Sequence, residues 1–285
     1  MISRAGFVFP ILMLAFLFAP ATTALAAGDA TRGEYIFHAG GCQSCHTAKN
    51  GALLAGGVRL DTPFGTFVTP NITPDPEAGI GGWSDDDFIR AMTEGLSPDG
   101  SPYYPSFPFT SYTHMTEQDL RDLKAWLDTV PPVATAAGPH DLNFPFSFRF
   151  GLWPWRWAFF DKAPFVANPD KSAEWNRGAY LVQGPGHCGE CHSPRNFAGV
   201  VDTDRAYAGN KNGSEGKPVP GLRPKDDIGN WSISDVTTIL QLGLTPDGDF
   251  MGGAMVDVIE NDTSKLTEAD VRAIAVYLKE LPPLD

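Results

Sequence analysis

The chain has little cysteine and few basic residues for its length. Its 285 residues include four cysteines, and 21 Lys and Arg stand against 34 Asp and Glu, giving a formal net charge of −13. An acidic surface repels polyanions, which disfavours nucleic-acid binding and favours partners that present a basic patch. No nucleophile triad, phosphate-binding loop or paired-carboxylate arrangement stands out, so we assign no catalytic residue.

Long apolar runs are also absent except at the amino terminus. There, Arg4 precedes an apolar run over 7–19, and small residues follow at 24–27. This order is typical of a secretory signal peptide, which predicts that residues 1–27 are removed on export. An uncleaved anchor over 5–27 is the alternative, because that charge-free stretch approaches the roughly 20 residues of a spanning helix.

The four cysteines form two CxxCH motifs, although four cysteines in an exported protein would ordinarily suggest two disulfides. The motif residues are Cys42, Cys45, His46, Cys188, Cys191 and His192. Two cysteines three positions apart lie about one helical turn from each other, so both sulfurs reach the vinyl groups on one porphyrin edge. The histidine that follows then ligates the iron. A single CxxC pair also suits zinc or a redox dithiol, but two complete motifs without a spare cysteine predict two covalently bound haem c groups.

The sequence around each motif repeats in the same order. An Arg-Gly pair stands about ten residues before each motif, and a Trp-Ser pair and a Pro-Asp-Gly turn follow it in both halves. Each half ends in an amphipathic helix that starts with Thr and stops at Pro-Pro, over 116–130 and 267–281. An earlier helix is expected at 84–94 with its counterpart at 232–242, each followed by glycine.

Alternating strand patterns are scarce, so we predict an all-α protein of two tandem domains with long Gly- and Pro-rich loops. The predicted domains are residues 28–135 and 172–285, joined by an aromatic and proline-rich linker at 136–171. Within that linker, residues 143–160 are crowded with Phe and Trp. We expect these rings to pack between the two domains. A docking surface for a partner subunit or a membrane interface is the alternative.

The sixth iron ligand must come from farther along each half. In the second half, Met255 is the preferred donor and Met251 the runner-up, because both lie on a glycine-rich loop before the last helix. In the first half, Phe107 aligns with Met255, and phenylalanine cannot ligate iron. We therefore predict Met115 as the first-half ligand, with His114 and an open iron site as alternatives.

Several other polar residues are weaker candidates. Arg59, Asn71 and Trp83 are of types that contact haem propionates. His38, His140 and His187 have no counterpart in the other half, and we expect them to be structural or exposed, with distal iron ligation as the alternative.

More specific motifs lie at 62–67 (TPFGTF), 71–75 (NITPD), 79–84 (GIGGWS) and 112–116 (YTHMT). With them, nearly the whole chain after the signal segment resembles dihaem cytochromes c related to the cytochrome subunits of bacterial membrane-bound alcohol, aldehyde and sugar-acid dehydrogenases. The resemblance implies class I cytochrome c folds, a periplasmic location, and electron passage from a dehydrogenase towards quinone or a terminal oxidase. The better-known subunits of this kind look like three-haem proteins, whereas this chain has two motifs.

We therefore expect an electron carrier rather than an enzyme. The competing hypothesis is a dihaem enzyme, similar to thiosulfate dehydrogenases or peroxidases, that works at an open or unusually ligated first haem. Phe107 is the feature that supports this alternative, since it stands where a methionine ligand is expected.

Overall fold

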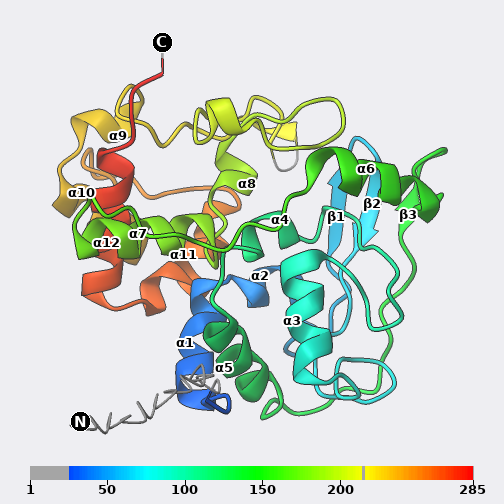
Figure 1. Cartoon of the computed structure of the whole chain (residues 1–285). Coiled ribbons are helices and arrows are strands. Elements are labelled where there is room, and N and C mark those ends of the chain that lie inside the picture. The colour runs from blue at the N-terminus through cyan, green and yellow to red at the C-terminus, as the bar shows by residue number, and fades with distance from the viewer. Residues whose placement is uncertain (1–25, 214–215, 285) are drawn as a thin grey trace, which may run out of the picture.

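The computed structural model describes residues 26–213 and 216–284, and it consists mainly of helices joined by long loops (Figure 1). The predicted signal segment therefore lies almost wholly outside the described residues. Within the described ranges, no helix has the length and apolar content needed to cross a membrane.

The helices and strands fall into two runs along the chain. The first run contains α1 (Ala30–Ala39), α2 (Cys42–His46), β1 (Arg59–Thr62), β2 (Gly65–Val68), α3 (Asp85–Glu94), α4 (Phe109–Tyr112), α5 (Glu117–Leu127), β3 (Asp141–Leu142), η1 (Arg149–Gly151) and α6 (Leu152–Phe159). The second contains α7 (Ala173–Gln183), α8 (Gly189–His192), η2 (Thr203–Arg205), α9 (Asp227–Asn230), α10 (Ile233–Leu242), α11 (Met255–Asn261), η4 (Thr263–Lys265) and α12 (Glu268–Lys279).

The helix boundaries follow the capping signals in the sequence. Ser84 and Ser232 each form a capping box with the Asp three residues later, at the start of α3 and α10. Both helices end at a glycine in the left-handed region, Gly95 with φ of 62° and Gly243 with φ of 70°. The four helices predicted from the repeat are therefore confirmed.

In each half, the first helix packs closely on the last, α1 against α5 and α7 against α12. The contact depends on the glycine of each repeated Arg-Gly pair. A Cβ atom at Gly33 would lie 1.9 Å from the Asp122 carbonyl oxygen, and one at Gly178 would lie 1.9 Å from the Ala273 carbonyl oxygen. Each glycine thus lets two helix backbones approach to a distance that any side chain would prevent.

Apolar side chains form one hydrophobic cluster around each helix pair. The first is made of residues such as Ile36, Phe37, Phe88, Leu120 and Leu123. The second is made of residues such as Leu181, Val182, Val236, Val271 and Ile274. Tyr35 packs against both clusters, so the two halves share a continuous apolar contact.

The two halves also cap each other's terminal helices through equivalent tyrosines. Tyr35 donates to the Asp270 carboxylate at 2.5 Å and accepts from the Thr267 backbone NH at 3.2 Å, at the start of α12. Tyr180 donates to Asp119 and accepts from the Thr116 NH at 3.2 Å, at the start of α5. The interface therefore has an approximate two-fold character, with each half binding the same place on the other.

The expectation of an all-α chain is wrong in one place. β1 and β2 form an antiparallel hairpin, with Arg59 opposite Val68, and β3 adds to it with Thr66 opposite Asp141. These strands are too short for alternation to be visible in the sequence, and β2 begins directly after the two-residue turn, at Gly65, with φ of 114°. The protein is therefore mostly, not wholly, α-helical, and the predicted linker contributes a strand to the first half.

The expected packing of the aromatic linker between the halves holds only in part: Trp155 contacts Phe109 of the first half and donates to the Ala198 carbonyl of the second at 3.0 Å, but other rings lie in solvent. Trp157, Phe144 and Phe150 are 89%, 82% and 75% exposed, although Leu152 of α6 is buried against Phe67 and Tyr104. Aromatic residues occur all round this short segment, and a helix that rests on one side leaves its other faces in solvent. Figure 1 places α6 beside the small sheet, at the far side of the first half from α12.

We expect Gly33→Ala and Gly178→Ala each to lower the free energy of unfolding by at least about 1–3 kcal/mol, because the new methyl group overpacks a helix crossing. Denaturant unfolding of the haem-loaded protein measures this effect. Gly252→Ala is the matched control, since no atom lies within 4 Å of its Cβ position. A comparable loss in the control, or none in the two crossing variants, would contradict the proposed role of these glycines.

Candidate functional site

The first CxxCH motif forms α2, a single helical turn that starts after Gly41 in the left-handed region, with φ of 61°. Cys42 and Cys45 are unpaired thiols, which leaves both sulfurs available for thioether bonds. His46 donates from Nδ1 to the Pro70 carbonyl oxygen at 2.8 Å. This bond fixes the ring and leaves Nε2 free, so Nε2 is the atom that would bind iron.

The second motif repeats this arrangement at α8. Cys188 and Cys191 are also unpaired, and His192 donates from Nδ1 to the Pro220 carbonyl oxygen at 2.8 Å. Burial lowers the pKa of His46 and of His192, so both imidazoles are neutral at pH 7, the form that binds iron. Both sites therefore provide the donor set that a covalently bound haem requires.

The first cysteine of each motif, Cys42 and Cys188, is partly buried, whereas Cys45 and Cys191 are exposed. Burial raises the pKa of Cys42 and of Cys188 to about 12. Burial raises the pKa of Cys45 to about 11, and the neighbouring Cys191 thiol contributes to that shift. Since thiols affect each other's ionisation only at short range, Cys45 of the first motif lies near Cys191 of the second.

Each motif is contacted by the segment that precedes the last helix of the other half. Ser111 and Thr110, at the end of α4, donate to Glu190 of the second motif at 2.8 and 3.1 Å. In the reverse direction, Ser44 of the first motif donates to Asp262 at 3.5 Å. The sequence did not indicate this reciprocal pair of contacts. The signal was present, because Ser111 and Asp262 both lie five residues before the Thr cap of the last helix.

The predicted first-half ligands lie close to the interface. Met115 is 4% exposed and packs in the first hydrophobic cluster, and its Cγ lies 3.6 Å from the Cβ position of Gly184. His114 is half-buried, which lowers its pKa. Phe107 contacts the ring of Tyr112, with the centroids 5.8 Å apart, and thus lines the same region without offering a donor. Met115 ligation stays a prediction.

The predicted second-half ligands occupy different elements. Met251 lies in the loop after α10, and its NH donates to the Gly243 carbonyl at 2.8 Å. Met255 is half-buried and is the first residue of α11, not part of that loop. The helix forms because Met255, Val258 and Ile259 repeat at helical spacing after Gly253 turns the chain. Ligation by Met255 also stays a prediction, and the ligand would come from the first residue of a helix, not from a loop.

The weaker candidates have other partners in the structure. The Asn71 amide donates to the Val133 and Thr135 carbonyls and accepts twice from Thr73, so it has no free group for a haem propionate. Arg59 lies 3.9 Å from Asp141 on the surface.

The unmatched histidines are engaged in the protein. His38 donates from Nδ1 to the Asn261 carbonyl at 2.9 Å, across the interface. His187 makes the same kind of bond to Pro185 at 2.7 Å and contacts the Tyr112 ring edge-on. Their structural role is thus consistent with the expectation from the sequence.

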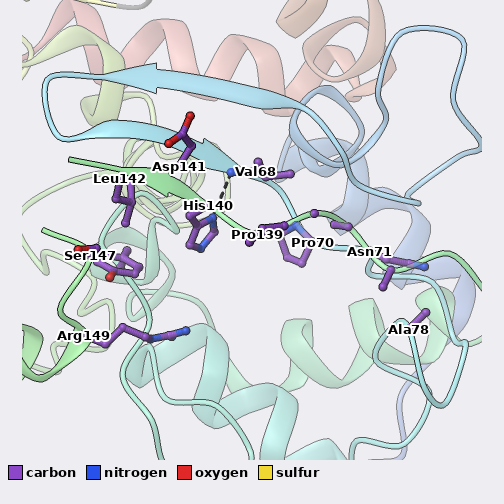
Figure 2. A pocket seen from close by; sticks show the side chains of 14 residues that line it. Val68, Pro70, Asn71, Ala78, Pro139, His140, Asp141, Leu142, Ser147 and Arg149 are labelled. Carbon is purple, nitrogen blue, oxygen red and sulfur yellow. Dashed lines mark hydrogen bonds between the residues drawn. The ribbon is translucent and has the colours of Figure 1, made fainter. Parts of the chain in front are cut away.

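A cavity of about 620 Å³ adjoins the first motif through Pro70 (Figure 2). His140 accepts from the Val68 NH at 3.1 Å through Nδ1, so its neutral ring carries the proton on Nε2. Arg149 stacks 5.4 Å from the Tyr104 ring centroid and donates to the Pro102 carbonyl. The cavity combines these two donors with apolar walls, but of the predicted haem-contacting residues only Asn71 lines it.

Comparison with known proteins supports the two-haem arrangement. The cytochrome c family model matches residues 30–131, which include the first motif. A "Diheme cytochrome c-type" protein of Cereibacter sphaeroides is 49% identical over 90% of this chain and 88% of its own length. The chain is a member of the dihaem c-type cytochromes. Two covalently bound haem c groups are its cofactors, and the two CxxCH motifs are the predicted attachment sites.

Other relatives of this dihaem cytochrome are subunits of larger complexes. The cytochrome c subunit of the quinone-type alcohol dehydrogenase of Gluconobacter oxydans is 38% identical over 88% of this chain and 54% of its own length. The gluconate 2-dehydrogenase cytochrome c subunit of Pantoea cypripedii is 38% identical over 89% of this chain and 60% of its own length. The chain thus spans somewhat more than half of these subunits.

We expect Met255→Ala and Met115→Ala each to remove about half of the weak far-red band that methionine-ligated ferric haem shows, because each variant removes one sulfur ligand of two. Absorption spectroscopy of the ferric protein measures the band. Met251→Ala serves as the matched control and leaves it intact. A band that survives Met255→Ala but disappears in Met251→Ala would reassign the second-half ligand.

Proposed function

We propose that this dihaem cytochrome is a periplasmic electron carrier that accepts electrons from a dehydrogenase and passes them towards quinone or a terminal oxidase. In this proposal, residues 28–135 and 172–285 are two tandem class I cytochrome c domains. The haems supply the redox chemistry when bound, and the protein supplies the thioether anchors, the axial ligands and the burial.

The observation that carries this proposal is the reciprocal contact between the two attachment motifs. Glu190 lies inside the second motif and is bound by residues of α4, while Asp262 of the second half lies against Ser44 of the first motif. Haems anchored to motifs that lie near each other at Cys45 and Cys191 are positioned to exchange electrons within one chain. The dehydrogenase partner is supported by the relatives, several of which are cytochrome subunits of dehydrogenases.

Charge supports a docking partner of opposite sign. The chain carries a formal net charge of −13, and loss of a signal segment that contains Arg4 and no acid would make it more acidic. A donor or acceptor with a basic docking face would be attracted over distance, which raises the rate of encounter at low salt. Periplasmic location rests on the signal-like segment and on the compartment in which a c-type cytochrome would meet such a dehydrogenase.

We expect the catalytic part of a purified membrane-bound alcohol dehydrogenase, given its own substrate, to reduce both haems and to add two electrons per chain. The rate falls as salt rises, because the attraction between opposite charges is screened. Stopped-flow absorption measures both quantities. Steady turnover of thiosulfate or peroxide, together with cyanide binding at the first haem without displacement of a ligand, would instead establish the dihaem enzyme.

We also propose that the aromatic segment, residues 143–160, rests on the surface of a phospholipid membrane. It exposes three aromatic rings by three-quarters or more, and it contains two arginines and no acid in an otherwise acidic protein. Trp and Phe side chains are stable at the boundary between lipid headgroups and acyl chains. The absence of acids in the segment removes repulsion from anionic headgroups.

We expect the double variant Phe150→Ser with Trp157→Ser to lose at least tenfold in binding to phosphatidylglycerol-containing vesicles, since each buried ring contributes roughly 1.5–3 kcal/mol. Co-sedimentation with the vesicles measures the affinity. Phe250→Ser is the matched control, because Phe250 is 75% exposed but lies in the second half. If the unsubstituted protein stays in the supernatant, or the control loses binding equally, the segment is not a membrane surface.

A further inference from the structure

Asp262 is a buried acid at the interface that the electron-carrier function leaves unexplained. It is 5% exposed and lies between α11 and η4. Its Oδ2 atom is 3.0 Å from the Cβ position of Gly41, the residue directly before Cys42. A carboxylate of the second half is therefore packed against the haem-attachment turn of the first half.

The surroundings of Asp262 do not compensate a negative charge. Among the described residues, its carboxylate has no ion pair, and its one hydrogen bond comes from Ser44 at 3.5 Å. Asp257 on α11 adds a like charge, Cys42 and Cys45 face it from α2, and Tyr112 faces it from α4. His38 on α1 is directed to the Asn261 carbonyl, not to the carboxylate. Burial raises the pKa of Asp262 to about 7.

The equivalent contact at the second motif is built differently. Glu190 accepts from Thr110 and Ser111, and Arg195 pairs with it at 2.5 Å. Its negative charge is therefore balanced by a neighbouring cation. The two haem sites differ, since an uncompensated acid adjoins the first and a neutralised ion pair adjoins the second.

We propose that Asp262 couples oxidation of the first haem, attached at Cys42 and Cys45, to the release of one proton. It does so by losing its own proton when that haem is oxidised. Asp262 is protonated while that haem is reduced. As one electron leaves for the second haem or for a haem acceptor, the Asp262 O–H bond breaks and its proton passes to solvent. The carboxylate then balances the positive charge that the first site has gained, and reduction reverses both transfers. This inference rests on the proposed electron-carrier function.

The direction of the pH dependence follows from this coupling. At low pH the acid is neutral and reduction of the first haem is easier. At high pH the carboxylate stabilises the oxidised form and the reduction potential falls. The limiting slope for one proton per electron is tenfold in the equilibrium constant per pH unit, which corresponds to about 59 mV.

The experiment is a spectroelectrochemical titration of the haem-loaded full chain at several pH values, with no partner protein present. We expect one of the two one-electron waves to fall over a window centred near pH 7, while the other stays constant. In Asp262→Asn the reduction potential of that wave no longer depends on pH. It keeps at every pH the higher value that the unsubstituted protein shows at low pH. Glu260→Gln is the matched control, because it removes an exposed acid on α11, two residues from Asp262, and should leave both the slope and its pH window unchanged.

A second readout identifies the proton itself. The reduced-minus-oxidised infrared difference spectrum should show the carbonyl band of a protonated carboxylic acid, and Asp262→Asn should lack it. If Asp262→Asn does not load both haems, Asp262→Ser replaces it, since serine occupies the equivalent position at Ser111. Two pH-independent waves in the unsubstituted protein, or a slope that persists without Asp262, would overturn the coupling. Failure of the dehydrogenase to reduce the protein would leave this titration unaffected, so the two proposals fail separately.

The same acid should affect stability. Its pKa in the folded protein lies above the ordinary value of 3.8, so the folded state holds a proton that the unfolded state loses between about pH 4 and pH 7. Stability therefore falls as pH rises through that window. We expect Asp262→Asn to unfold at a higher denaturant concentration than the unsubstituted protein at pH 8 and at the same concentration at pH 4.

Discussion

The two attachment turns are held in place by hydrogen bonds that each half donates or accepts at equivalent positions on the other. Tyr35 and Tyr180 cap the terminal helices across the interface, and the turns before those helices reach the opposite CxxCH motif. Helix starts carry unsatisfied backbone NH groups, so a side chain that supplies an acceptor there fixes the orientation of the whole helix. The relative position of the two haem sites thus depends on these contacts.

The approximate symmetry of the interface makes its departures informative. Serine lies on the motif and aspartate on the turn at the first site, whereas glutamate lies on the motif and serine on the turn at the second. Only the glutamate has a cationic partner, Arg195, among the described residues. Two sites that share one backbone plan therefore place different charges beside their haems, which is a direct way to separate two reduction potentials.

Local signals in the sequence predicted the helices well. Ser84, Ser232 and the two Thr caps are read within four residues of the chain, and the CxxCH motifs need no tertiary information. The interface was not predictable in this way, because Tyr35 and Asp270 are 235 residues apart. The three short strands escaped detection for the same reason, since β3 is stabilised by β2 and not by its own two residues.

The aromatic linker shows a different limit of sequence reasoning. Its rings indicated burial, and the structure buries only some of them: Trp155 and Phe160 pack on Phe109, whereas Phe144, Phe150 and Trp157 lie in solvent. Composition predicts that apolar surface will be covered, but it does not identify the molecule that covers it. The sixth ligands share this limit, since no local pattern encodes the packing that would bring a methionine to each iron.

The exchange of tyrosine caps has a consequence for how the chain melts. If one half opened alone, the remaining half would keep a terminal helix whose first NH groups and acidic cap residue had lost their tyrosine partner. Partial opening is thereby penalised on both sides, and the two halves are bound into one cooperative folding unit. The protein would then show a single calorimetric transition although its sequence is duplicated. A substitution that destabilises one haem pocket would also destabilise the other.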